Sequence, residues 1–138
     1  MVLVDSSVWI EALHREGRLD IKLAVEGLLE ADEALICAPV RLKVLGGARK
    51  EDREIISRHL SFLPDRPCGD DDWNRATRLT WNCLDAGLAL PVNQALVASI
   101  ALHDGIRIFA TDEVFDGISS RTGLPLYMPG RGGLFRPA

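Results

Sequence analysis

The sequence of 138 residues has few of the features that mark secreted or membrane proteins. Its only cysteines are Cys37, Cys68 and Cys83, an odd and scattered set that argues against a disulfide framework or a zinc site. No stretch approaches the roughly 18 apolar residues that a membrane-spanning helix needs. The start, MVLVDSSVW, lacks the basic segment of a secretory signal. We therefore expect a cytoplasmic protein with reduced cysteines and no membrane partner.

Positive charge is also scarce. The formal net charge is −4, which disfavours a protein that grips long duplex nucleic acid. It leaves open an enzyme that takes one short RNA strand into a local pocket. The three histidines, His14, His59 and His103, are far apart in sequence, and we interpret them as surface or helix-end residues rather than ligands.

Short apolar runs alternate with longer amphipathic segments, and this alternation predicts an α/β domain with a central parallel sheet of four or five strands. We expect strands at residues 2–4, 34–38, 106–109 and 124–128. We expect helices after residue 5, over 19–31, 39–45, 50–62, 70–86 and 92–103, and after residue 112. The domain is predicted to span 1–129, followed by a flexible tail over 130–138 that is rich in Gly and Pro.

A run of three acidic residues, Asp70, Asp71 and Asp72, precedes the apolar positions of one expected helix. Carboxylates at the first turn of a helix cap free backbone N–H groups and compensate the helix dipole. We interpret the run in this way, and a metal site is the alternative.

Two other carboxylates follow separate strands. Asp5 comes directly after the first strand, and Asp112 comes soon after the third. In parallel sheets, ligands bind beyond the carboxyl ends of the strands, so neighbouring strands would bring both side chains into one crevice. Such a pair can hold a hard cation such as Mg²⁺, act as an acid and a base, or simply cap helices.

Three stretches resemble the PIN-domain family, and specifically the VapC-type toxins. They are VLVDSSVWIEAL at residues 2–13, APVRLKVLGGARK at 38–50 and LALPVNQALVASIALHDGIRIFATDEVF at 88–115. The spacing from Asp112 to Phe115 also matches. Together the stretches span nearly the whole chain.

This resemblance implies a PIN-like three-layer fold and an endoribonuclease that depends on Mg²⁺ or Mn²⁺. It also implies a protein antitoxin as partner and a homodimer. In the family, four acidic side chains hold the cation, which activates a water and stabilises charge on the scissile phosphate.

Carried over by position, the resemblance assigns Asp5 and Asp112 as catalytic and metal-binding residues. Lys43 stands where the family has a glutamate, and Gln94 stands where it has an aspartate, so the site is degenerate. Ser6 and Ser7 lie beside the first acid, where they could contact a phosphate or a water, or cap the helix.

Two interpretations remain open. The chain is either a metal-dependent endoribonuclease with weak activity or an inactive PIN domain that binds an antitoxin or RNA. Because a lysine disfavours a divalent cation, we hypothesise that Lys43 pairs internally with Asp5 or Asp112. The alternative is that Lys43 extends into solvent while Glu11 helps Asp5 to bind one weakly held metal ion.

Overall fold

The computed structural model describes residues 1–129 and 135–136. The expected flexible tail over 130–138 lies mostly outside these residues. Within it, Phe135–Arg136 form strand β6, which pairs antiparallel with β5 (Met128–Pro129).

The predicted parallel α/β sheet is confirmed. Its four strands are β1 (Val2–Val4), β2 (Ala34–Cys37), β3 (Asp65–Arg66) and β4 (Arg107–Phe109), in the order β3-β2-β1-β4. All three strand pairs are parallel. The sequence did not predict β3, because this strand is two polar residues long and has no apolar pattern.

The strand expected over 124–128 is wrong in its extent. Only Leu126 forms a bridge, to Ile108 of β4. Ile108 N donates a hydrogen bond to Pro125 O at 3.0 Å, and Ile108 O accepts one from Tyr127 N at 2.8 Å. Pro125 has no N–H to donate, which limits the ladder, and the chain then continues into β5.

Helices connect the strands and cover the sheet. In the described residues they are α1 (Ser6–Leu13), α2 (Leu19–Glu30), α3 (Ala38–Gly46), the 3₁₀ helix η1 (Lys50–Asp52), α4 (Arg53–Ser61), α5 (Asp70–Asp85), α6 (Val92–Asp104) and α7 (Val114–Thr122). These bounds agree with the predicted helices to within a few residues.

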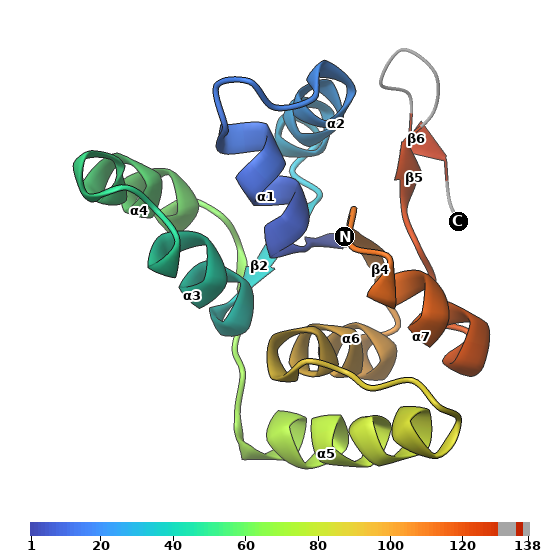
Figure 1. Cartoon of the computed structure of the whole chain (residues 1–138). Coiled ribbons are helices and arrows are strands. Elements are labelled where there is room, and N and C mark those ends of the chain that lie inside the picture. Colours follow the sequence, from blue (N-terminus) through green and yellow to red (C-terminus); the bar gives the residue numbers. More distant parts are fainter. Residues whose placement is uncertain (130–134, 137–138) are drawn as a thin grey trace.

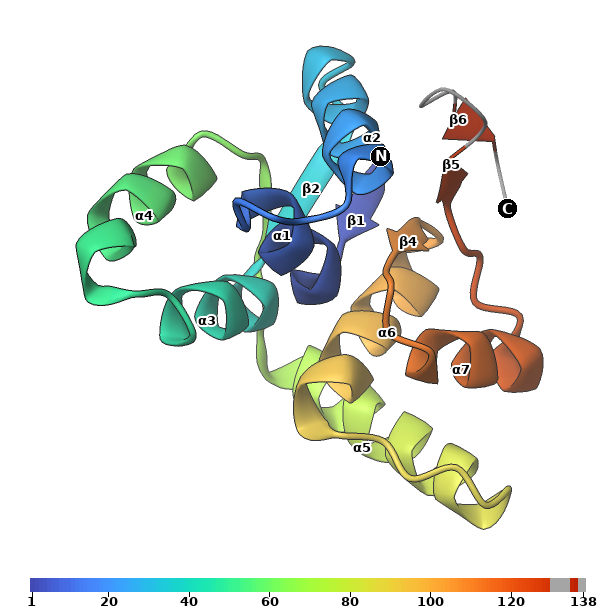
Figure 2. The same ribbon diagram turned by 45° about the horizontal axis from the view of Figure 1, so that its top comes forward.

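The strand order places a topological switch point between β1 and β4. From β1 the chain proceeds outward through β2 to β3, and it then returns past β1 to β4. Figures 1 and 2 show α1 and α2 on one side of the sheet, and α6 with α5 on the other. Open sheets of this kind bind ligands in the crevice at the switch point, which is where β1 and β4 end.

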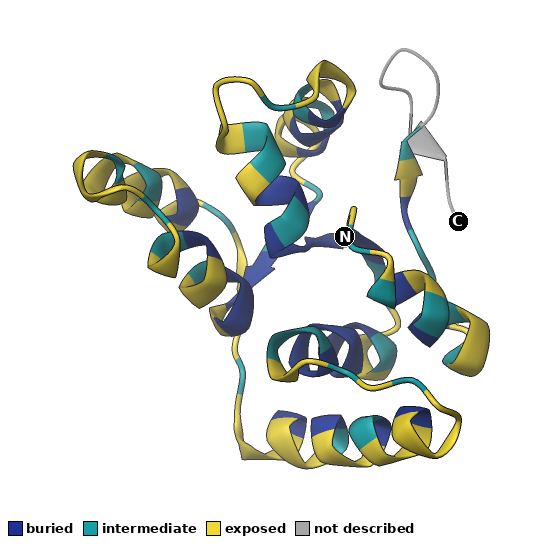
Figure 3. Ribbon diagram, in the orientation of Figure 1, coloured by how far each residue is buried: buried dark blue, intermediate teal, exposed yellow. Residues whose placement is uncertain are grey.

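The core lies between the sheet and the helices (Figure 3). Every residue of β1 is buried, and so is each residue of α6 from 95 to 101. Helix α6 is therefore enclosed on most sides, as its continuous apolar sequence predicted. Helix α5 buries one side and exposes the other. None of the described helices is both long and apolar enough to cross a membrane.

Candidate active site

Asp5 is the first residue of the candidate site, and it connects the end of β1 to the start of α1. Its backbone N donates to Phe109 O at 2.9 Å, which fixes it beside the end of β4. Its Oδ2 caps α1 by accepting Ser7 N at 3.0 Å and Ser7 Oγ at 2.6 Å. The residue is only 2% exposed, and its Oδ1 is buried with no hydrogen-bond partner.

Asp112 lies just beyond the end of β4, the strand that pairs with β1, and close enough for its charge to act on Asp5. Its Oδ1 accepts Val114 N at 3.0 Å, and its Oδ2 accepts Gln94 Nε2 at 3.0 Å. The orientation of the Gln94 amide follows from chemistry, since the carboxylate needs a donor. Ser7 joins the two halves because its Oγ also accepts Thr111 N at 3.0 Å. The structure therefore brings Asp5, Asp112 and Gln94 together.

In the described part of the chain, neither Asp5 nor Asp112 forms a salt bridge. Burial raises the pKa of Asp5, the hydrogen bonds from Ser7 lower it in part, and the negative charge of Asp112 raises it further. Among the residues that the structure describes, no positive side chain contributes to the shift. A buried carboxylate in this situation favours its protonated form more than an exposed one does.

Lys43 does not supply the missing cation, so the hypothesis of an internal ion pair is wrong. Within the described residues, its ammonium forms no hydrogen bond or salt bridge with any carboxylate. The side chain is exposed and lines a cavity of about 830 Å³ between α1, α3, α5 and α6. There the ammonium keeps its hydration, whereas contact with buried Asp5 would remove it.

The other polar residues near Asp5 are engaged elsewhere. Glu11 Oε1 accepts Arg18 N at 2.7 Å, so Glu11 does not assist Asp5. Ser6 is buried, and the Ser7 hydroxyl is already bonded to Asp5 and Thr111. Both serines thus serve the start of α1 in this structure, and a phosphate contact stays a prediction.

The described residues do not fit a tightly held divalent cation. Among them no group of three or more His, Cys, Asp or Glu side chains is placed to hold a metal ion. The crevice offers two carboxylates, and Gln94 presents an N–H to one of them. The orphaned Oδ1 of Asp5 remains as one free oxygen, whereas a protein site for Mg²⁺ needs several oxygen ligands, including water.

A second carboxylate cluster, which the sequence did not reveal, lies where β3 meets α5 and α6. Arg66 donates to Asp72 through Nη1 at 2.7 Å and Nη2 at 3.0 Å. It also donates to Asp104 through Nε at 2.8 Å and Nη2 at 3.0 Å. These bonds hold the pKa of both carboxyl groups below the usual value.

Asp72 also stabilises the start of α5, because its Oδ2 accepts a hydrogen bond from the backbone N of the N-cap residue Gly69 at 2.9 Å. The run 70–72 therefore occupies the first turn of α5, as predicted, and belongs to no metal cluster of the described residues. The acidic run at residues 70–72 was the sequence signal that pointed to part of this cluster.

Comparison with known proteins finds similarity to VapC ribonucleases. Ribonuclease VapC11 of Mycobacterium tuberculosis is 30% identical over 129 residues, which cover 90% of this chain and 96% of that protein. Two solved structures share the fold at low identity. A chain of a toxin–antitoxin complex from Klebsiella pneumoniae has a TM-score of 0.64 and 20% identity, covering 82% of this chain and 88% of its own. M. tuberculosis VapC20, described as a toxin that cleaves the sarcin–ricin loop, has a TM-score of 0.64 and 16% identity, covering 84% and 93%. No protein-family model matches the sequence.

Proposed function

Because this chain belongs to the VapC family of ribonucleases, we propose that it is a VapC-type toxin domain whose RNA-cleaving site is weakened. Its partner is an antitoxin protein, as in the toxin–antitoxin complex from K. pneumoniae that shares its fold. Its target class is RNA, its place is the cytoplasm, and its functional form is a homodimer.

One observation supports the weakened site above all others. The Gln94 amide donates to Asp112 Oδ2 at the position where the resemblance expects another carboxylate. An aspartate there would add negative charge and a further oxygen ligand, whereas the amide N–H occupies a lone pair of Asp112. With Lys43 in the place of a second acid, this chain keeps two of the family's four acidic side chains.

The chain's own residues can still orient a substrate. Asp112, held by Gln94 and Val114 N, is a fixed negative group that positions a water or a sugar hydroxyl through a hydrogen bond. Asp5 is buried and its pKa is raised, so it holds a proton more readily than an ordinary aspartate. The Mg²⁺ or Mn²⁺ ion of the family would supply water activation, but the described residues offer too few oxygen ligands to hold it tightly.

The second candidate function is an inactive PIN domain that binds its antitoxin, or binds RNA without cutting it. The same bond between Gln94 and Asp112 favours this function if cleavage is fully lost. Fold does not decide between the two, because the chemistry belongs to the site.

A nuclease assay separates the candidates. Purified protein is incubated with total RNA and Mg²⁺ or Mn²⁺, as wild type, as Lys43→Glu with Gln94→Asp, and as that double variant with Asp5→Ala. We expect weak or absent cleavage by the wild type, cleavage at least about tenfold faster by the double variant, and none once Asp5 is removed.

Calorimetric titration with Mn²⁺ gives an independent readout. The double variant should bind Mn²⁺ much more tightly than the wild type. Sub-millimolar Mn²⁺ binding by the wild type, or rapid wild-type cleavage that Asp5→Ala abolishes, would contradict a weakened site. Absence of any gain in the double variant would contradict the assignment of positions 43 and 94.

A further inference from the structure

A small cavity with a basic lining lies between α5 and α6. Its volume is about 320 Å³, which is at the lower end for a ligand site. Two arginines, a histidine and a serine make up most of the lining, which consists of Arg75, Arg78, Leu79, Ser99, Leu102 and His103. Positive charge therefore gathers at this cavity, although the whole chain has a formal net charge of −4.

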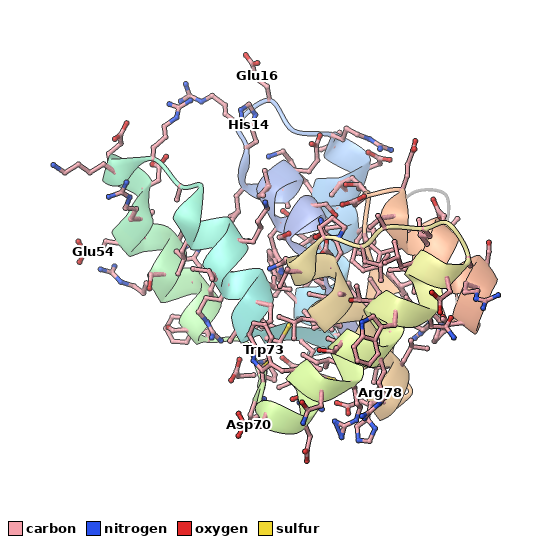
Figure 4. The ribbon with its side chains drawn as sticks, turned by 60° about the horizontal axis from the view of Figure 1, so that its bottom comes forward. His14, Glu16, Glu54, Asp70, Trp73 and Arg78 are labelled. Atoms are coloured by element: carbon pink, nitrogen blue, oxygen red, sulfur yellow. The ribbon has the colours of Figure 1, made fainter. Side chains whose placement is uncertain are left out.

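Helical spacing explains why these side chains share one cavity. Arg75 and Arg78 are three residues apart on α5, so both lie on one side of that helix. Ser99 and His103 are four residues apart on α6 and lie together in the same way. Arg78 comes five residues after Trp73, about 140° further around α5, so the two side chains point in different directions (Figure 4). The basic cavity is thus distinct from the cavity of about 830 Å³ that Trp73 lines.

Ser99 places a hydroxyl where the rest of α6 is apolar. Residues 95 to 101 are all buried, and Ser99 is the one polar residue among them. It is 4% exposed and lines the cavity, and its hydroxyl forms no hydrogen bond within the part of the chain that the structure describes. Buried polar groups are usually paired, so an unpaired hydroxyl at a cavity wall indicates a place for a ligand acceptor.

Arg75 is held in place but only weakly neutralised. Its Nη2 lies 3.1 Å from His103 Nε2, and because a guanidinium can only donate, that ring nitrogen is the acceptor. Its Nη1 lies 3.5 Å from Asp72 Oδ1, whereas Asp72 accepts two shorter bonds from Arg66. Arg75 therefore keeps N–H groups that can donate to a ligand.

Arg78 has even less compensation. Among the described residues its guanidinium forms no hydrogen bond or salt bridge. The carboxylates nearest to the cluster, Asp72 and Asp104, are both bound by Arg66, and no acidic side chain of the described residues lines the cavity. The cavity therefore presents two arginines and an unpaired hydroxyl, which together suit an anion.

We propose that this cavity binds a phosphate group, to which Arg75, Arg78 and Ser99 donate hydrogen bonds while His103 orients Arg75. Arginine suits phosphate because its planar fork donates two parallel bonds to the oxygens of one group. The phosphate can belong to an RNA strand or be a free phosphate ion, because both present the same oxygens. The inference goes beyond the proposed function, since the cavity and the Asp5 crevice share no residue.

Calorimetric titration of the full chain with inorganic phosphate tests the site. At low salt, where exposed charges are least screened, the dissociation constant should be about 1 mM or below. Arg78→Gln should raise it about tenfold or more, and Ser99→Ala about threefold or more. Arg58→Gln is the matched control, because Arg58 is an exposed arginine of α4 that does not line the cavity, and it should change the constant less than twofold.

A second titration identifies the source of the phosphate. The same variants are titrated with a short single-stranded RNA, without divalent cations, and binding is followed by fluorescence anisotropy. Weaker RNA binding by Arg78→Gln than by Arg58→Gln, with competition by inorganic phosphate, supports an RNA phosphate at the site. RNA binding that Arg78→Gln leaves unchanged, together with weakened binding of inorganic phosphate, supports a free phosphate ion.

Two results would overturn the proposal. One is a wild-type protein that binds neither inorganic phosphate nor RNA, and the other is binding that Arg78→Gln weakens no more than Arg58→Gln does. Circular dichroism verifies that each variant is folded, and Ser99→Ala places an alanine among the alanines of α6. Neither titration measures cleavage or contains Mn²⁺, so the proposed function is judged separately.

Discussion

Asp72 and Asp5 are both almost fully buried aspartates at the start of a helix, yet their surroundings are opposite. Asp72 accepts two hydrogen bonds from Arg66, which also holds Asp104, and the pKa of Asp72 is lowered. Asp5 accepts hydrogen bonds from the hydroxyl and backbone N of Ser7, and burial raises its pKa. The pKa of Asp72 is lowered first by hydrogen bonds from a cationic side chain, whereas burial is the largest cause of the raised pKa of Asp5.

The comparison also separates a structural cluster from a candidate active site. The Arg66 cluster ties the edge strand β3 to the start of α5 and the end of α6, and each of its charges has a partner. The Asp5 crevice leaves one oxygen without a partner at the switch point of the sheet. Unbalanced groups of this kind gather where a protein binds or reacts rather than where it is only held together.

The largest effect is expected from Arg66→Leu. This change would remove the two short bonds to buried Asp72 and leave the longer contact from Arg75 Nη1 at 3.5 Å, so the free energy of unfolding should fall by about 3 kcal/mol. The side chains of Arg66 and Asp72 are 19% and 6% exposed, so water cannot readily replace the bond. Urea denaturation measures the change.

Arg58→Leu is the matched control, because Arg58 pairs with Glu54 on the open surface of α4. Its effect should stay below about 0.5 kcal/mol. A similar loss in both variants would mean that the Arg66 cluster is no more than a surface ion pair.

Much of the fold could be predicted from local sequence. The alternation of apolar strands and amphipathic helices gave the parallel sheet, because that pattern has few other solutions. Asp5 and Asp112 each follow a strand in the sequence, and this position predicted that their side chains lie close together if the two strands are neighbours. The strands did prove adjacent, with Leu3 of β1 in register with Ile108 of β4.

The parts that could not be predicted depend on contacts between distant segments. Arg66 and Asp104 are 38 residues apart, and no periodicity joins them. The two-residue β3 has no apolar signal. The direction of the Lys43 side chain also could not be read from sequence, because charge attraction favours Asp5 whereas hydration favours the exposed cavity, and the fold sets the balance.

A smaller effect is expected from Gln94→Leu. The change removes the donor to Asp112 Oδ2 in a half-buried crevice, so the free energy of unfolding should fall by about 1.5 kcal/mol. Asn82→Ala is the control, because it removes an exposed amide oxygen that accepts a hydrogen bond from Arg121 Nε. Its free energy of unfolding should fall by about 0.5 kcal/mol or less. Equal costs would indicate that water fully replaces Gln94 beside Asp112.

Asp5→Asn should instead stabilise the fold at neutral pH, on the order of 1 kcal/mol. Asparagine keeps the cap oxygen for Ser7 and removes the buried charge. Because the folded-state pKa of Asp5 lies above its usual value of 3.8, wild-type stability falls as pH rises from that value through the folded pKa. The advantage of the variant should therefore be present at about pH 7 and vanish at about pH 3.5. A variant less stable than the wild type at neutral pH would contradict this prediction, because it would mean that interactions with the ionised Asp5 carboxylate outweigh its burial.

The smallest effect is expected from Lys43→Met on the titration of Asp5. If Lys43 were paired inside the crevice, removing its charge would raise the pKa of Asp5 strongly. Since Lys43 is exposed in the cavity between α1, α3, α5 and α6 and does not contribute to the Asp5 shift, the midpoint should move by less than about 0.3 pH units, as for screened charges. Carbon-13 NMR of the Asp5 carboxyl group measures the midpoint directly, with Lys50→Met as a control for the loss of one exposed positive charge. A larger upward shift for Lys43→Met than for the control would place the lysine back inside the crevice and remove the contrast between the two carboxylate clusters.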